Sequence, residues 1–145
     1  MDIILEQILE NLFALNNLKV TAVINKKEKI IEFIKSTING DKIKTYLAIN
    51  AHVKPKVLGA LLYVLTNVRL IKIEIDKEGS ISSSSFFLDK MVSVDRKLIG
   101  DNISSIDVIF QNTSIGLRYP ISDTKITDFF QTIEQLKAER DDVNT

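Results

Sequence analysis

The chain has 145 residues, of which 45% are hydrophobic and 26% are charged. This length and composition are typical of one globular domain with a core large enough to fold without disulfide bonds or structural metals. The chain contains no cysteine, which excludes disulfides, thiolate nucleophiles and cysteine-ligated zinc, and which suits a reducing cytoplasm.

The formal net charge is zero, from 19 basic and 19 acidic residues, so a general electrostatic attraction to nucleic acid is not expected. The bases are nevertheless concentrated, because residues 40–72 hold six of them and Asp41 is the one acid there. The longest apolar run, residues 57–65, is about half of what a membrane-spanning helix needs. We therefore expect a cytoplasmic protein without a transmembrane segment and without nucleic acid as a partner.

Two helices are predicted at the N-terminus. Residues 2–15 place isoleucine, leucine and phenylalanine at helical spacing, with acids between them, which predicts an amphipathic helix. The helix carries no base, which disfavours the alternative of a membrane-surface helix. Residues 16–24 are expected to be a connection. Residues 26–38 predict a second helix with a capping box formed by Asn25 and Glu28, although the β-branched content leaves a strand as the alternative.

From Lys42 to His52 the hydrophobic period changes to two, which predicts a strand with one buried and one solvated face. The buried face is expected to begin at Ile43, and the solvated face to carry Lys44, Tyr46, Ala48, Asn50 and His52. Pro55 ends the strand because proline cannot donate to a sheet ladder. A hairpin follows, with arms at 59–65 and 68–75 and a turn near Thr66-Asn67.

Four more strands are predicted, and polar turns separate them. They are expected within residues 82–88, 91–98, 103–110 and 114–119, with turn signals at Gly79, at Gly100-Asp101-Asn102 and at residues 111–113. Apolar residues then recur at helical spacing from Ile126 to Leu136, and either Ser122 or Asp123 is placed to cap this last helix.

The order of elements is helix, helix, seven strands, helix. It predicts a mainly β, α+β fold in which an antiparallel meander closes into a barrel or splits into two sheets. The C-terminal helix is expected to cap this barrel, and the residues after it, 141–145, are expected to fray.

Seven strands followed by one helix is the order of pleckstrin-homology domains, and two segments strengthen the resemblance. LTNVRLIKIEI at 65–75 resembles the "lTnkRLi" signature of bacterial pleckstrin-homology-like domains, and FFLDKMVSVD at 86–95 resembles the segment that follows it in that family. The resemblance covers about residues 41–138. It implies a PH-like seven-stranded barrel or sandwich at 41–140 after an N-terminal helical extension at 1–40. It also implies a binding or assembly module, sometimes oligomeric, without enzymatic activity.

The residues themselves also argue against an enzyme. The one histidine, His52, can form neither a two-histidine metal site nor a triad, and no HExxH, EF-hand, GxSxG or phosphate-binding glycine motif occurs. We therefore predict no catalytic residue, no metal site and no cofactor. Arg69 is expected either to lie on the outer face of its strand or to brace the turn by bonding to carbonyl groups or to Asp89.

The local concentration of bases is the one signal for a ligand site. The candidate ligand-binding residues are Lys42, Lys44, His52, Lys54 and Lys56. In eukaryotic pleckstrin-homology domains the loop between the first two strands often holds inositol phosphates, and cations converging on a polyanion would make charge-assisted contacts. That loop has no arginine for bidentate phosphate binding, which weakens the analogy.

Two functions therefore stay open. The first is a module for protein–protein interaction or homo-oligomerisation, which would use exposed strand edges and the N-terminal amphipathic helix. The alternative is a module that binds anionic lipid or a small anion through the basic loop between the first two strands.

Overall fold

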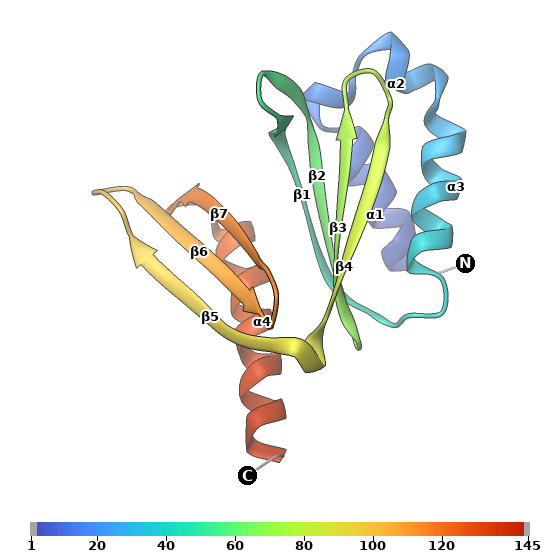
Figure 1. Cartoon of the computed structure of the whole chain (residues 1–145). Helices are drawn as coiled ribbons and strands as arrows, with labels where there is room; N and C mark the ends of the chain where they lie inside the picture. Colours follow the sequence, from blue (N-terminus) through green and yellow to red (C-terminus); the bar gives the residue numbers. More distant parts are fainter. Residues whose placement is uncertain (1–2, 144–145) are drawn as a thin grey trace. The chain divides into compact units, whose positions relative to one another are not determined.

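The computed structural model describes residues 3–143 and divides the chain into two compact units, Met1–Ser85 and Phe86–Thr145 (Figure 1). The described residues form seven strands, all of them in antiparallel sheets, together with N-terminal helices and one C-terminal helix. This confirms the α+β fold class and the element order of a pleckstrin-homology-like domain. The division between 1–40 and 41–140 as functional domains stays a prediction.

The first unit consists of a helical layer on one face of a four-stranded sheet. Its helices are α1 (Ile3–Phe13), the 3-10 turn η1 (Asn16–Leu18), α2 (Thr21–Asn25) and α3 (Lys27–Ile38). Its strands are β1 (Ile43–Lys54), β2 (Val57–Thr66), β3 (Arg69–Asp76) and β4 (Ile81–Phe87), which lie side by side in that order (Figure 1).

The core of this unit lies between the helices and the sheet. The helices contribute Ile8, Leu12, Leu18, Val23, Ile30, Ile34 and Ile38, and the strands contribute Ile43, Ala60, Leu62, Val64, Ile71, Ile73 and Ile75. The predicted helices at 2–15 and 26–38 are confirmed by α1 and α3. The expected connection at 16–24 contains η1 and most of α2 instead, because Leu18 and Val23 are apolar anchors that pack into the same core.

The predicted capping box at the start of α3 is wrong. Asn25 is the last residue of α2, and Lys26 is the N-cap of α3 without a side-chain hydrogen bond to the helix. The two helices follow each other so closely that Asn25 keeps a helical position, which is incompatible with the extended backbone of a capping residue.

The solvated face predicted for β1 is partly wrong as well. Tyr46 and Ala48 pack against the helical core, and the Asn50 side chain accepts a hydrogen bond of 3.0 Å from the backbone N–H of Asn17. A register shift between Ile43 and Thr45 brings Ile43 to this same core. A period of two separates the faces of a strand, but it does not show that a helix from elsewhere in the chain covers the less apolar one.

The hairpin between β2 and β3 turns one residue later than predicted, at Asn67-Val68. Thr66 ends β2 and is fully buried. Its hydroxyl oxygen accepts hydrogen bonds from the backbone N–H groups of Val68 and Arg69, at 3.2 and 3.1 Å. Thr66 therefore stabilises the turn by hydrogen bonds from a buried position at the end of β2.

The second unit is a three-stranded sheet with a long helix packed on it. After the 3-10 turn η2 (Leu88–Lys90), its elements are β5 (Met91–Leu98), β6 (Ile103–Phe110), β7 (Ser114–Pro120) and α4 (Thr124–Val143). Phe130 of α4 stacks on Tyr119 of β7, with the ring centres 6.5 Å apart, and Ile126, Phe129 and Ile133 of the helix are buried.

Both ends of α4 are fixed by side-chain hydrogen bonds. Asp123 caps the helix, because its Oδ1 accepts from the backbone N–H of Ile126 at 3.1 Å. Arg140 donates to the carbonyl oxygens of Leu88 and Met91, at 2.5 and 2.8 Å. Of the tail predicted to fray, Asp141–Val143 belong to α4 and residues 144–145 lie outside the described residues.

Candidate binding surfaces

The five basic residues predicted to bind a ligand do not converge on one point. Lys42 and Lys44 lie at the start of β1, His52 and Lys54 at its end, and Lys56 in the turn that follows. A strand rises about 3.3 Å per residue, and Lys54 lies ten positions after Lys44, so the two ends are separated by roughly 30 Å. All five residues are exposed.

The loop between β1 and β2 is a tight turn of two residues, Pro55-Lys56. Lys56 has a φ of 63°, in the left-handed region, and a proline followed by a residue with positive φ is typical of a type II turn. Lys54 directly precedes this turn, and Lys56 lies in it. The turn is too short to fold around a ligand, as a longer loop could.

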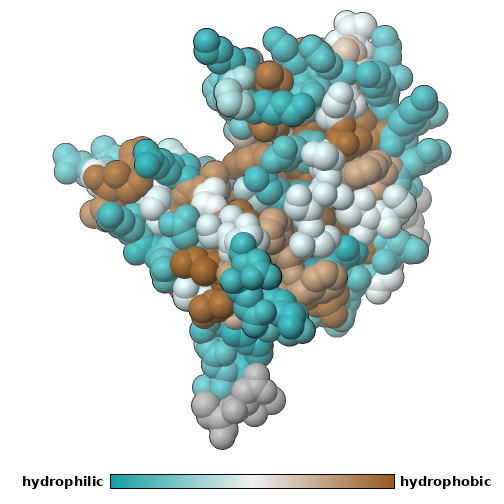
Figure 2. Space-filling view, in the orientation of Figure 1, coloured by the Kyte–Doolittle hydropathy of each residue, from teal (hydrophilic) through white to brown (hydrophobic). Residues whose placement is uncertain are grey.

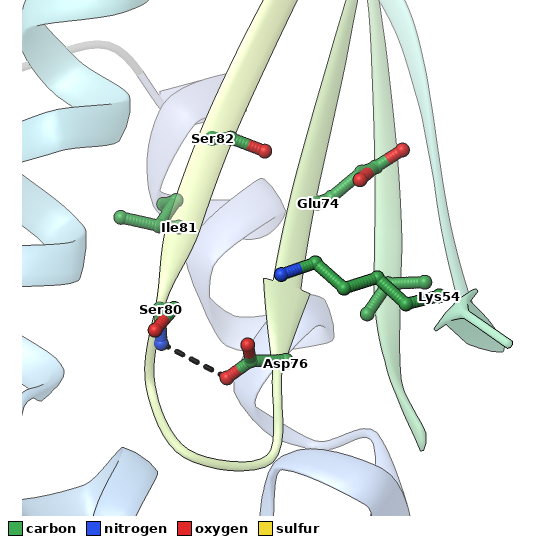
Figure 3. A pocket seen from close by; sticks show the side chains of 7 residues that line it. Lys54, Glu74, Asp76, Ser80, Ile81 and Ser82 are labelled. Carbon is green, nitrogen blue, oxygen red and sulfur yellow. Dashed lines mark hydrogen bonds between the residues drawn. The ribbon is translucent and has the colours of Figure 1, made fainter. Parts of the chain in front are cut away.

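A small pocket lies beside Lys54, and it contains acids as well as the cation. It has a volume of about 240 Å³ and is lined by Val53, Lys54, Glu74, Asp76, Ser80, Ile81 and Ser82. Figure 3 shows the Lys54 side chain extending toward β3, at a level between Glu74 and Asp76. These two carboxylates offset the charge of Lys54 on the side that faces β3, which disfavours a small polyanion there.

The acids of this pocket already have structural roles. Asp76 is buried, and its Oδ1 accepts hydrogen bonds from the backbone N–H groups of Glu78 and Ser80, at 2.9 and 3.0 Å. It thereby shapes the turn between β3 and β4, and Figure 3 shows the bond to Ser80. Glu74 pairs with Lys72 on the same strand, with Oε1 and Nζ 3.2 Å apart.

Arg69 braces the first unit and is not a free binding group. Its Nε donates to Asp41 Oδ2 at 2.7 Å, its Nη2 to the carbonyl oxygen of Thr37 at 2.5 Å, and its Nη1 to Ser85 Oγ at 2.9 Å. Bonding to a carbonyl agrees with one of the two predicted roles. Asp89 is not the partner, because Asp41 precedes β1 close enough to reach the turn.

An apolar groove lies between α1 and α3. It has a volume of about 550 Å³ and is lined by Glu6, Leu9, Glu10, Phe13, Ala14, Lys27 and Ile31. Lys27 Nζ lies 5.0 Å from the centre of the Phe13 ring, within the range of a cation–π contact. The apolar residues that line the groove therefore extend the core-facing apolar surfaces of the two helices toward solvent.

Exposed aliphatic side chains gather at one end of the β5-β6-β7 sheet. They are Leu98, Ile99, Ile103 and Ile121, which are 64%, 44%, 40% and 48% exposed. The chain segments are adjacent, because Ile99 donates to the carbonyl of Ile103 and Ile121 to that of Asn102, both at 2.9 Å. Figure 2 shows brown surface at this end of the β5–β6 hairpin. We name these four residues the aliphatic end.

The sequence pattern does not predict the aliphatic end, because Leu98 and Ile103 are the terminal apolar residues of the two expected strands at 91–98 and 103–110 and so are grouped with the residues of a buried strand face. The available signal was the pair Leu98-Ile99 directly before the turn at Gly100-Asp101-Asn102. An apolar pair at a hairpin tip lies at the end of the sheet, and Leu98 and Ile99 are accordingly exposed.

Comparison with known proteins supports the fold and goes no further. The chain matches no protein-family model and no curated protein sequence. It is similar in structure to the hSac2 domain from human phosphoinositide phosphatase Sac2, with a TM-score of 0.51 and 14% sequence identity. The similarity covers 79% of this chain and 84% of that one. In addition, no helix within residues 3–143 is long and apolar enough to cross a membrane.

Proposed function

We propose that this chain is a non-enzymatic binding module of the bacterial pleckstrin-homology-like type, working in the cytoplasm through protein–protein contacts that include self-association. The aliphatic end is the observation that carries the proposal. Burying a large aliphatic side chain contributes about 1.5–3 kcal/mol, so four such residues left exposed together favour a partner that covers them.

The backbone around the aliphatic end suits a contact surface. The backbone N–H groups of Ile99 and Ile121 are already hydrogen-bonded to neighbouring carbonyl groups, so a partner that covers these two residues leaves neither N–H group unpaired. The turn Gly100-Asp101-Asn102 lies beside the apolar side chains and supplies a polar rim.

The test is the molar mass of the full chain by size-exclusion chromatography with light scattering across a concentration series. We expect a mass that rises above that of the monomer, and a monomer for the variant with Leu98→Glu and Ile103→Glu. The matched control, Asn112→Glu with Gln131→Glu, adds the same charge at exposed polar positions of the same unit and should behave as wild type. A strict monomer at every concentration, combined with identical co-purifying proteins for all three chains, would refute the proposal.

A second candidate function is contact with anionic lipid or a small anion at the Pro55-Lys56 turn. The exposure of His52, Lys54 and Lys56 supports it, and the similar structure comes from a protein described as a phosphoinositide phosphatase. Co-sedimentation with anionic liposomes at rising salt tests it. Lys54→Ala with Lys56→Asn removes the charge while keeping a residue that tolerates positive φ. Unchanged binding by this variant would exclude the turn as the site.

A further inference from the structure

The outer edge of β1 is not paired with another strand within the described residues. The four-stranded sheet has the order β1-β2-β3-β4, so β1 pairs with β2 on one side, and no strand of the described residues pairs with its other side. Roughly half of the backbone N–H and C=O groups of a 12-residue edge strand point away from the sheet and can accept an added strand.

The charges along this edge are all of one sign. Lys42 and Lys44 lie at its start and His52, Lys54 and Lys56 at its end, while residues 45–51 carry no charge. No acidic residue occurs anywhere from Lys42 to Ile73, so β2, the strand next to β1, offers no carboxylate to neutralise them. Glu74 and Asp76 of β3 offset the charge of Lys54 where its side chain faces the pocket, and Asp41, directly before Lys42, is paired with Arg69.

We propose that the β1 edge binds an extended acidic peptide segment as an added strand, with acidic residues at both ends of the segment and an uncharged centre. In this arrangement the basic residues contact the peptide along the length of β1 instead of converging on one small ligand. This inference deepens the proposed function, on which it rests, by naming the chemistry of one protein partner at a second surface.

The distribution of charge favours an acidic peptide over two other possible binding partners of the β1 edge. A small phosphate or a single lipid headgroup cannot reach both ends of a row of cations spread over roughly 30 Å. A second copy of β1 paired antiparallel would set Lys44 opposite His52 or Lys54, and like charges directly opposite each other destabilise a strand pair. An acidic strand satisfies the backbone and the charges together.

The first experiment uses a fluorescein-labelled 12-residue peptide with two glutamates at each end and alternating valine and threonine between them. Fluorescence anisotropy with the full chain should show saturable binding that weakens as salt rises. The same peptide with lysines in place of the glutamates should not bind. Absence of binding by the acidic peptide would overturn the proposal and would mean that the lysines only protect the edge against aggregation.

Two N-methylated peptides separate strand addition from simple charge attraction. Methylating the backbone nitrogens of alternate residues blocks one edge of the peptide, and methylating the other residues blocks the opposite edge. We expect one peptide to retain affinity and the other to lose it. Equal affinity for both would overturn the added-strand geometry.

Protein variants locate the site on β1. Lys44→Gln and Lys54→Gln should each weaken binding by about threefold, because each removes one exposed ion pair at an opposite end of the peptide. Lys29→Gln, an exposed lysine of α3, is the matched control and should leave the affinity unchanged. Equal effects of all three variants would place the peptide elsewhere. Failure of these tests leaves the mass measurement on the aliphatic end unaffected, so the two proposals fail separately.

Discussion

At the scale of single residues, the segment Thr66-Asn67-Val68-Arg69 joins three parts of the first unit. The Asn67 side chain and backbone pair with the backbone of Lys42, at 3.2 and 3.0 Å, which fixes the start of β1 beside the turn. Arg69 connects this segment to the C-terminal turn of α3 by its hydrogen bond to Thr37, and to Asp41 by an ion pair. The residues of this segment are therefore structural.

We predict that Arg69→Met lowers the free energy of unfolding by about 2–4 kcal/mol. The variant leaves the Asp41 carboxylate, whose side chain is 15% exposed, without its cation, and it leaves the Thr37 carbonyl without its donor. Urea denaturation measures the change. Lys72→Met, which breaks the more exposed pair with Glu74, is the control and should cost less than about 1 kcal/mol. A loss for Arg69→Met no larger than for the control would contradict the bracing role.

We also predict that Tyr63 makes the protein less stable at high pH. Burial, aided by the nearby charge of Glu74, raises the pKa of Tyr63 to about 12, whereas a tyrosine in the unfolded chain ionises near pH 10. Between these values the folded state keeps a proton that the unfolded state has lost, so stability falls as pH rises. The loss approaches about 2–3 kcal/mol at pH 12.

The measurement is urea denaturation at pH 9 and pH 11 of wild type and of Tyr63→Phe. Other groups titrate in this range in both proteins, so the difference between their two pH dependences isolates Tyr63. We expect the shallower decline for Tyr63→Phe. Parallel declines would show that the Tyr63 hydroxyl does not contribute.

At the scale of elements, α1 and η1 are part of the first core. Ile8, Leu12 and Leu18 are fully buried against the sheet, although they precede the first strand by more than twenty residues. Removing residues 1–24 to test self-association would therefore unfold this unit, and surface substitutions are the suitable probes.

We predict that Leu12→Ala destabilises the protein by about 2–5 kcal/mol, the usual range for truncating a buried leucine. Ile3→Ala lies on the same helix but at a position that is 70% exposed, and it should cost less than about 0.5 kcal/mol. Thermal or urea denaturation compares the two. Similar small losses would mean that α1 is not docked on the sheet in solution.

The N-terminus of α4 gives a second test at this scale. The hydrogen bond from the Ile126 backbone N–H to Asp123 Oδ1 identifies the cap that the sequence left open between Ser122 and Asp123. We predict that Asp123→Ala costs about 1 kcal/mol of stability and that Ser122→Ala is nearly neutral. Urea denaturation measures the loss of stability in both variants. A larger loss for Ser122→Ala would assign the cap to the serine instead.

At the scale of the whole molecule, a net charge of zero conceals an uneven distribution. The basic residues of 42–56 follow one strand, while Asp41, directly before them, pairs with Arg69, and Glu74 and Asp76, which lie beside Lys54, belong to β3. Charge counting detected this concentration of bases. It did not show that the bases lie along a line, because their spacing depends on one uninterrupted strand of 12 residues from Ile43 to Lys54.

The sequence by itself determined the fold class, most element boundaries and the helical faces. Local periodicity carries this information, and each helix or strand needs only its own residues to express it. It also placed a turn within one residue of Asn67-Val68 and named Asp123 as one of two caps.

Only the tertiary structure decided which faces are covered and which groups meet. The packing of Tyr46 and Ala48 against the helical core, the ion pair of Arg69 with Asp41, and the exposure of Leu98 and Ile103 all depend on residues distant in the chain or on the end of a sheet. A pattern records how apolar a face is. It does not record what packs on that face, and this is why the candidate surfaces emerge from the folded chain.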